Sequence, residues 1–158
     1  MANIQIYETE NLLLEAVKKP HVTRTDGGHL KITPKEHLKD RTEMTPQLAK
    51  EYMRLTMIVG EAFEKAMANR GIPLMRVNYQ DMGNWAYKEG KPPYFHLHIY
   101  GRAKNAVHQP YMESVYLPDR STGFYDTFEP LNADDVAEIK YQIELVSQQQ
   151  KYWKENWK

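Results

Sequence analysis

The chain has 158 residues, 21 basic and 21 acidic side chains and therefore no formal net charge, 41% apolar residues, six histidines and no cysteine. A chain of this length fits one domain, which buries roughly two-thirds of the unfolded surface. The lack of cysteine excludes a disulfide framework, a thiolate nucleophile and a cysteine-based zinc site. Zero net charge argues against a surface built to bind a polyanion, although it allows a small basic pocket for one phosphate.

The apolar runs of the chain are short, and its first residues are polar. Residues 12–14, one of the longest such runs, are far too few to span a bilayer. Residues 1–10 are polar and acidic, which is not the pattern of a secretory signal. We therefore expect a soluble, cytoplasmic protein. Because other nucleophilic or soft side chains are so few, the six histidines become the first candidates for chemistry.

The first half of the chain predicts a turn, a strand and a long helix. Residues 10–18 allow either a helix or a strand. The two glycines within residues 24–28 indicate a turn, and the alternating residues 29–33 after it predict a strand. Residues 45–71 predict a helix, because they begin with Thr-Pro, end with glycine and carry apolar residues every three or four positions.

The second half predicts two strands, an irregular segment and a final helix. These are, in chain order, strand 74–80, loop 81–92, strand 94–100, irregular segment 102–129 with a short strand at 114–117, and a helix capped by Asn132. The loop between the two strands has no helical pattern, so the strands most simply form an antiparallel pair. We therefore predict an α+β fold, an antiparallel sheet with one long helix packed on it and a C-terminal helix.

Residues 94–100, Tyr-Phe-His-Leu-His-Ile-Tyr, carry the most chemical information. Alternate side chains of a strand point to opposite faces, so the apolar residues face the core while His96 and His98 share the other face. Two such histidines lie about 7 Å apart at their Cα atoms, close enough to bracket one phosphate or to chelate one metal ion. The alternative is a solvent-facing pair without a role.

Two further polar positions point to the same region. The Gly-Gly turn before His29 implies a close backbone approach, which makes His29 a candidate, whereas His37 is more typical of a surface residue. By alternation Asn78 shares a polar face with Arg76 and Gln80. That face borders the histidines if the two strands pair in the right register.

Together these features resemble the histidine-triad (HIT) family of nucleotide-binding proteins. The likeness lies in their order: a His…Pro-Lys-x-His strand, a long helix, a strand ending in Val-Asn, and a His-Leu-His strand followed by Gly-Arg. It covers roughly residues 27–102. It implies a single HIT-like domain over residues 1–158, in which 103–158 form a C-terminal extension.

The family motif is His-Φ-His-Φ-His-Φ-Φ, where Φ is apolar, and this chain departs from it. With Tyr94 in the first histidine place, His96 and His98 are the second and third histidines and all four apolar places are filled. A register that begins at His96 instead puts Tyr100 in the last histidine place and Gly-Arg in the apolar places. We adopt the first register.

The resemblance implies a role for each matched residue. His96 is the nucleophile, which attacks an α-phosphorus to give a nucleotidyl-histidine that water hydrolyses, while His98 and His29 bind the phosphoryl oxygens. A neutral imidazole suits this task because its ordinary pKa is near 6.5. The scheme needs no metal or other cofactor. The implied nucleotide-binding residues are Asn78, Tyr94, Arg102 and His21.

Three functions stay open from the sequence. The first is a hydrolase or nucleotidyl transferase acting on a nucleoside monophosphate ester or phosphoramidate. Because Tyr94 cannot carry positive charge, the second is a HIT-fold protein that binds a nucleotide with little or no catalysis. The third is a metal site of His96 and His98 with His29 or His37. The resemblance further implies a homodimer with a small-molecule nucleotide as ligand, and neither membrane nor extended nucleic acid as partner.

Overall fold

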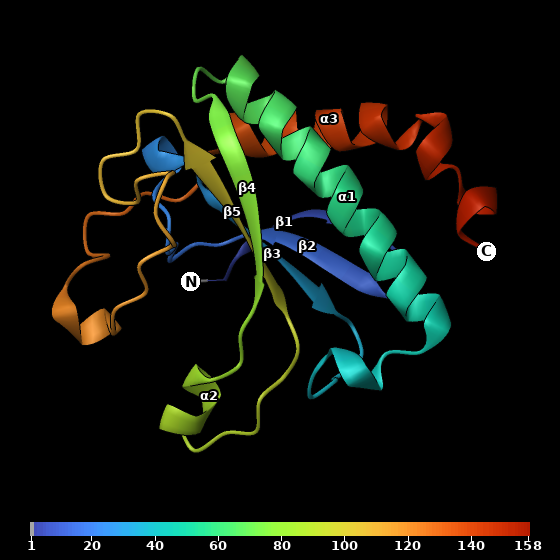
Figure 1. Ribbon diagram of the computed structural model, residues 1–158, viewed down its shortest axis with the longest axis horizontal. Helices are drawn as coiled ribbons and strands as arrows, with labels where there is room; N and C mark the ends of the chain where they lie inside the picture. Colours follow the sequence, from blue (N-terminus) through green and yellow to red (C-terminus); the bar gives the residue numbers. More distant parts are fainter. Residues whose placement is uncertain (1) are drawn as a thin grey trace.

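The computed structural model describes residues 2–158, which form one five-stranded antiparallel sheet with two long helices packed against it (Figure 1). The elements are β1 (Ile4–Glu8), β2 (Leu12–Ala16), β3 (His29–Pro34), α1 (Pro46–Asn69), β4 (Leu74–Asp81), α2 (Trp85–Lys88), β5 (Leu97–Ala103) and α3 (Ala133–Ser147). The strand order across the sheet is β1-β2-β3-β5-β4. The predicted α+β class and the antiparallel pairing of β4 with β5 are confirmed.

Helix α1 forms where the capping residues predict it. The Thr45 hydroxyl accepts a hydrogen bond from the Leu48 N–H at 3.2 Å, and Pro46 occupies the first turn. After the helix, Gly71 takes a positive φ of 79°, which suits glycine at a helix C-terminus. The predicted apolar face is buried throughout, and it consists of Leu48, Tyr52, Leu55, Val59, Ala62 and Ala66. This face joins the helix to the sheet in a single core.

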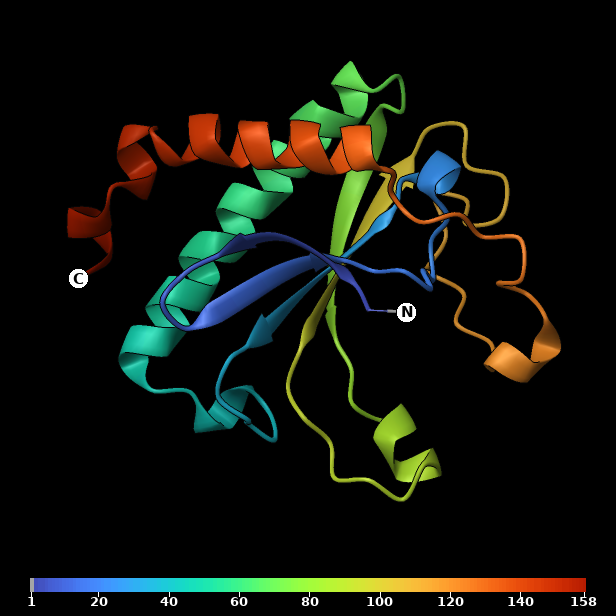
Figure 2. The same cartoon turned by 180° about the vertical axis from the view of Figure 1, so that it is seen from behind.

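Helix α3 crosses α1 on the same side of the sheet, as the view from behind shows (Figure 2). Its N-terminus has the predicted Asn132 cap, which forms a capping box in which Asn132 and Asp135 exchange two hydrogen bonds of 3.0 Å. Asp135 is fully buried and also accepts hydrogen bonds from Arg24 at 2.5 Å and Arg70 at 3.0 Å. Burial acts to raise the pKa of Asp135, but these hydrogen bonds outweigh it and the pKa lies below its ordinary value.

The N-terminal strands and one later segment differ from the sequence predictions. Residues 10–18, which allowed a helix or a strand, contain β2, and it pairs with β1, a strand that the sequence did not predict. The predicted loop 81–92 contains the short helix α2. The predicted strand at 114–117 is wrong, because Tyr116 directs both backbone groups to the Gln109 side chain, at 2.9 Å each, rather than to another strand.

Strand β5 begins three residues later than predicted. Leu97 is the first residue paired on both sides, with Ile32 of β3 and Asp81 of β4. Before it the Phe95 N–H donates instead to the Leu38 carbonyl at 2.6 Å. Residues 94–96 therefore leave the sheet while the chain stays extended. As a result His96 lies one residue before the first paired residue of β5 and outside the hydrogen-bonded part of the strand.

The close backbone approach predicted for the Gly-Gly turn is confirmed. A Cβ atom on Gly27, whose φ is 129°, would lie 2.2 Å from the Gly101 carbonyl oxygen, and a Cβ on Gly101 would lie 2.3 Å from that of Gly27. No larger side chain fits either place without moving the backbone. This contact holds the start of β3, and with it His29, directly against β5.

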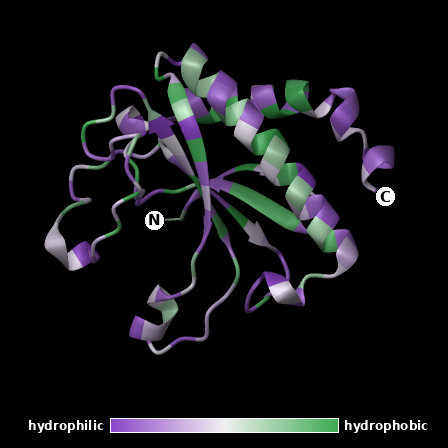
Figure 3. Ribbon diagram, viewed as in Figure 1, coloured by the Kyte–Doolittle hydropathy of each residue, from purple (hydrophilic) through white to green (hydrophobic). Residues whose placement is uncertain are grey.

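Apolar residues gather where the helices meet the sheet, whereas the β4–β5 connection and the segment after β5 contain both hydrophilic and hydrophobic residues (Figure 3). No helix within residues 2–158 is long and apolar enough to cross a membrane.

Candidate functional site

Four histidines from separate parts of the chain meet on the sheet face that α1 does not cover. His29 comes from β3, His98 from β5, His96 from the extended residues before β5, and His21 from the connection between β2 and β3. The strand register places His29 opposite Tyr100 of β5. His29, His96 and His98 were predicted from the sequence to lie together, and their contacts place them together.

Hydrogen bonds link three of these imidazoles, those of His29, His98 and His96, in a definite direction. The backbone N–H of His21 donates to His29 Nδ1 at 3.1 Å, so this nitrogen is an acceptor. A neutral His29 then carries its proton on Nε2 and donates it to His98 Nδ1 at 2.8 Å. His98 in turn carries its proton on Nε2 and donates it to His96 Nε2 at 2.9 Å. The contacts therefore define one tautomer for His29 and one for His98.

The chain of hydrogen bonds ends at His96. Its Nδ1 lies 3.1 Å from the Tyr94 carbonyl oxygen, to which only a protonated nitrogen can donate. The Nε2 atom of His96 consequently holds an unshared electron pair, which accepts from His98. The ring of His96 therefore has an unprotonated nitrogen that can act as a nucleophile, and the hydrogen bond from Nδ1 to the Tyr94 carbonyl fixes the orientation of the ring.

Burial keeps these histidines neutral. It is the largest cause that lowers the pKa of each ring, followed by repulsion from neighbouring charges for His21, His29 and His98. The pKa falls to about 4 for His21 and to about 2 for His98, and that of His29 lies well below its ordinary value. Neutral rings agree with the tautomers that the hydrogen bonds define.

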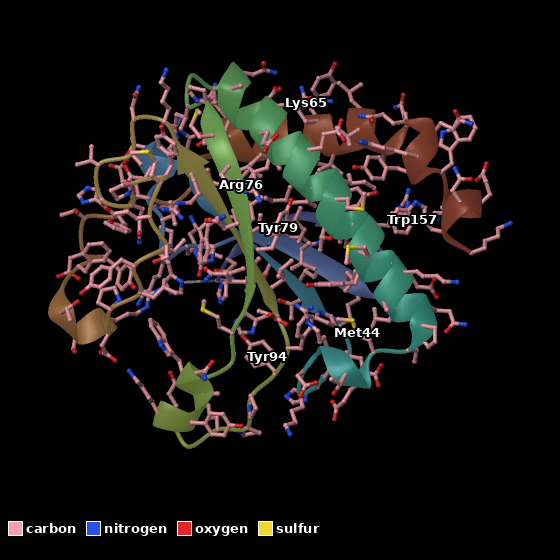
Figure 4. The ribbon with its side chains drawn as sticks, viewed as in Figure 1. Met44, Lys65, Arg76, Tyr79, Tyr94 and Trp157 are labelled. Carbon is pink, nitrogen blue, oxygen red and sulfur yellow. The ribbon has the colours of Figure 1, made fainter. Side chains whose placement is uncertain are left out.

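A cavity of about 620 Å³ opens onto this cluster, a size that suits a small molecule. The connection between β4 and β5, which includes α2, forms one wall, and Arg120 lies on the segment after β5. Its aromatic and charged lining residues are His21, Trp85, Glu89, Lys91, Tyr94, His96, His98 and Arg120. Figure 4 shows Tyr94 beyond the ends of the strands, on the approach to α2.

Two of the predicted nucleotide-binding residues lie elsewhere. Arg102 is 1% exposed and donates to Asn78 Oδ1 at 2.7 Å and to the carbonyls of Pro110 at 2.5 Å and Glu113 at 2.9 Å. Neither Arg102 nor Asn78 lines the cavity. The structure therefore joins these two residues to each other and to the segment after β5, and it does not bring them to the histidines.

Several aromatic residues at the site were not predicted as site residues from the sequence. The Tyr100 hydroxyl lies 2.9 Å from His21 Nδ1, and the rings of Trp85 and Tyr125 each lie 5.4 Å from that of His21. Alternation along β5 places Tyr100 on the histidine face, so the sequence could have predicted that Tyr100 lies at the site. Tyr125 follows no periodic pattern, and nothing in the sequence places it beside His21.

The histidines also offer a set of possible metal ligands. One ring nitrogen from each of His21, His29 and His98 lies within 4.8 Å of the others. This set replaces His96 and His37 of the predicted metal site with His21. Both nitrogens of His29 and both of His98 already take part in hydrogen bonds, so a metal ion would have to displace some of them.

Neither a protein-family model nor a curated protein sequence matches this chain. Solved structures do resemble it. A hypothetical histidine triad nucleotide-binding protein from Sulfolobus tokodaii strain 7 aligns with a TM-score of 0.60 and 16% identity, covering 97% of this chain and 91% of that one. A Hit-like protein involved in cell-cycle regulation from Bartonella henselae gives 0.57 and 13%, covering 90% and 87%.

A zinc-bound histidine triad family protein from Mycobacterium smegmatis gives a TM-score of 0.56 and 19% identity, covering 93% of this chain and 88% of that one. Likeness at these identities concerns the fold. The chain therefore has the histidine-triad fold, as its motif order predicted.

Proposed function

We propose that the protein binds a nucleotide and acts as a HIT-like hydrolase or nucleotidyl transferase on a nucleoside monophosphate ester or phosphoramidate. The observation that carries this proposal is the chain of hydrogen bonds that leaves His96 Nε2 unprotonated beside the cavity. Attack by this nitrogen on the α-phosphorus forms the N–P bond while the P–O or P–N bond to the leaving group breaks. Water then releases the nucleotide in a hydrolase, or an acceptor takes it in a transferase.

The neighbours of His96 suit this reaction. The Tyr94 carbonyl accepts the Nδ1 proton of His96 and stabilises the positive charge that develops on the ring as the N–P bond forms. His98 donates its Nε2 proton to His96, and the same proton is available to a phosphoryl oxygen when substrate enters. His29 holds His98 in the donating tautomer.

We assign the remaining candidates by their places around the cavity. Tyr94 and His21 line it and are proposed to contact the nucleotide, with Trp85 as an additional aromatic wall. Asn78 and Arg102 are proposed to hold the segment after β5 in place, because their hydrogen bonds lead there. Binding with little or no catalysis stays as an alternative, since Tyr94 cannot supply positive charge.

Thermal unfolding with AMP or with zinc separates the nucleotide proposal from the metal alternative. We expect AMP to raise the melting temperature in the presence of EDTA, because a ligand at 100 times its Kd stabilises a folded protein by about 2.7 kcal/mol. Stabilisation by zinc alone, with none by AMP, would favour the site of His21, His29 and His98 instead. Mass spectrometry after an alkaline quench, which preserves the N–P bond, should then find the nucleotidyl group on the peptide that contains His96 during turnover of adenosine 5′-phosphoramidate.

We also propose that two copies of the chain pair through α1 and β4. β4 is an edge strand of the sheet, and exposed apolar side chains lie on it and on α1, namely Met53, Met57, Met75 and Tyr79. Figure 4 shows Tyr79 on β4 beside α1, where its hydroxyl approaches Gly60. An unpaired edge next to exposed apolar residues is typical of a protein interface.

Light scattering on the purified protein tests this pairing. We expect a particle of twice the chain mass of 18.6 kDa, and we expect Met57→Glu to shift it to a monomer because a charge would be buried in the interface. Met112→Glu is the matched control, since Met112 is exposed on the segment after β5. A wild-type monomer, or a dimer that persists in Met57→Glu, would count against pairing through this face.

A further inference from the structure

Formal charges are few in the cavity. Among residues 2–158 its lining includes three charged side chains, Glu89, Lys91 and Arg120. Lys91 and Glu89 form an ion pair of 2.7 Å and so cancel each other. Arg120 has no carboxylate partner within ion-pair distance in the described part of the chain, and donates one hydrogen bond, of 2.8 Å, to the Lys19 carbonyl. Arg120 is therefore the uncompensated positive charge of the cavity.

The rest of the site cannot neutralise an anion. The four histidines are neutral donors and acceptors, and Tyr94, in the first motif position, carries no positive charge. A phosphoryl anion placed beside them would gain hydrogen bonds but would lose its hydration without meeting an opposite charge, which is costly. A guanidinium group supplies both the charge and paired N–H donors that match phosphate oxygens.

The fold holds Arg120 in position from two sides. Its guanidinium lies 4.9 Å from the centre of the Tyr125 ring, and that ring contacts His21. The preceding residue, Asp119, forms an ion pair of 2.7 Å with Lys88 of α2, which links this segment to the wall formed by the β4–β5 connection. Asp119 also caps the short 3-10 turn Arg120–Thr122. These contacts place the exposed Arg120 side chain at the cavity before an anion binds.

We propose that Arg120, on the segment after β5, holds the phosphate of the bound nucleotide and supplies the positive charge that the histidine strand lacks. This inference rests on the proposed function and deepens it, because it names the group that recognises the anionic part of the ligand. A segment that the HIT resemblance does not cover would thereby contribute a substrate-binding residue to the site.

Binding of AMP and of adenosine to Arg120→Gln tests the proposal. Glutamine keeps a side-chain N–H for the Lys19 carbonyl but removes the charge. We expect the Kd for AMP to rise by about 10- to 100-fold, as for the loss of a charge-assisted hydrogen bond, while the Kd for adenosine stays unchanged. Arg120→Lys should retain part of the affinity, because it keeps the charge and loses the paired donors. The control is Arg76→Gln, which removes an exposed arginine of β4 outside the cavity.

The possible results distinguish a failure of the role of Arg120 from a failure of the proposed nucleotide-binding function. If Arg120→Gln and Arg76→Gln bind AMP equally while the wild type binds it well, the role of Arg120 is wrong and the proposed function stands. Equal losses of AMP and adenosine affinity in Arg120→Gln would also overturn the role, because they would indicate a change of cavity shape. If the wild-type protein binds no AMP, the proposed function fails and the role of Arg120 fails with it. The salt dependence of AMP binding should weaken in Arg120→Gln and not in the control.

Discussion

Replacing His96 with alanine is expected to lower kcat for adenosine 5′-phosphoramidate by about 10⁴-fold or more, as removal of a covalent nucleophile does in other enzymes. His96 lines the cavity, and its Nε2 is unprotonated because its Nδ1 donates to the Tyr94 carbonyl. His98 cannot take its place, because its Nδ1 is occupied by His29 and its Nε2 carries the proton. The measurement is steady-state turnover of the wild-type and variant proteins, with AMP binding measured alongside.

The control for this prediction is His108→Ala. The His108 ring packs on Phe128 in the segment after β5 and lies outside the cavity, so its loss should leave kcat unchanged. His98→Ala should also be strongly impaired, because it removes the donor that faces the phosphoryl group. Equal turnover by the wild type and His96→Ala would contradict the assignment of the nucleophile, even if both proteins bind AMP.

The regular part of the site could be predicted from the sequence because strands have a period of two. Alternation alone placed His96 and His98 on one face, and the Gly-Gly turn correctly indicated that β3 meets another backbone closely. The expectation that the polar face of β4 borders the histidines was correct at Gln80, which lies opposite His98, whereas Asn78 lies opposite Tyr100 and binds Arg102. These features depend on local rules that a single sequence contains.

The irregular part of the site could not be predicted in the same way. Segment 103–117 is held by side chains that bond its backbone, and such bonds leave no periodic signal. The buried Asp26 carboxylate accepts the N–H groups of residues 107–109, and Arg102 binds the carbonyls of Pro110 and Glu113. Because Arg120 and Tyr125 follow this segment, their positions depend on these contacts. The sequence alone therefore does not show which residues Arg120 and Tyr125 contact.

The difference between local rules and irregular contacts also explains why Arg102 was predicted to bind the nucleotide although it does not line the cavity. Its place after the histidine strand, next to a glycine, matches the HIT pattern and suggested a phosphate contact. Alternation puts it on the histidine face, but it lies opposite Arg76, farther along β5 from the cavity. There its buried guanidinium binds carbonyl oxygens. The arginine that lines the cavity is instead Arg120, about twenty residues later in the chain.

The neutral histidine cluster is expected to make the protein sensitive to mild acid. In the unfolded chain a histidine takes up a proton as the pH falls through about 6.5, whereas burial keeps His21, His29 and His98 neutral in the fold to much lower pH. Their contribution to the free energy of unfolding is therefore complete above pH 6.5 and is lost progressively below it. Each group loses about 1.4 kcal/mol per pH unit until its folded pKa is reached, near 4 for His21 and near 2 for His98.

Between pH 7 and pH 5 these three histidines together should remove about 6 kcal/mol, which is comparable with the whole stability of many domains. Carboxylates contribute little in this window, because their unfolded pKa values lie near 4. Urea unfolding at pH 7, 6 and 5 measures the loss directly. His98→Gln should flatten the dependence by about one third, since one of the three groups no longer titrates, and His108→Gln, which changes a histidine outside the cluster, is the matched control. A free energy of unfolding that is the same at pH 7 and pH 5 would show that the cluster is not held neutral, and the tautomers that leave His96 Nε2 free for attack would lose their support.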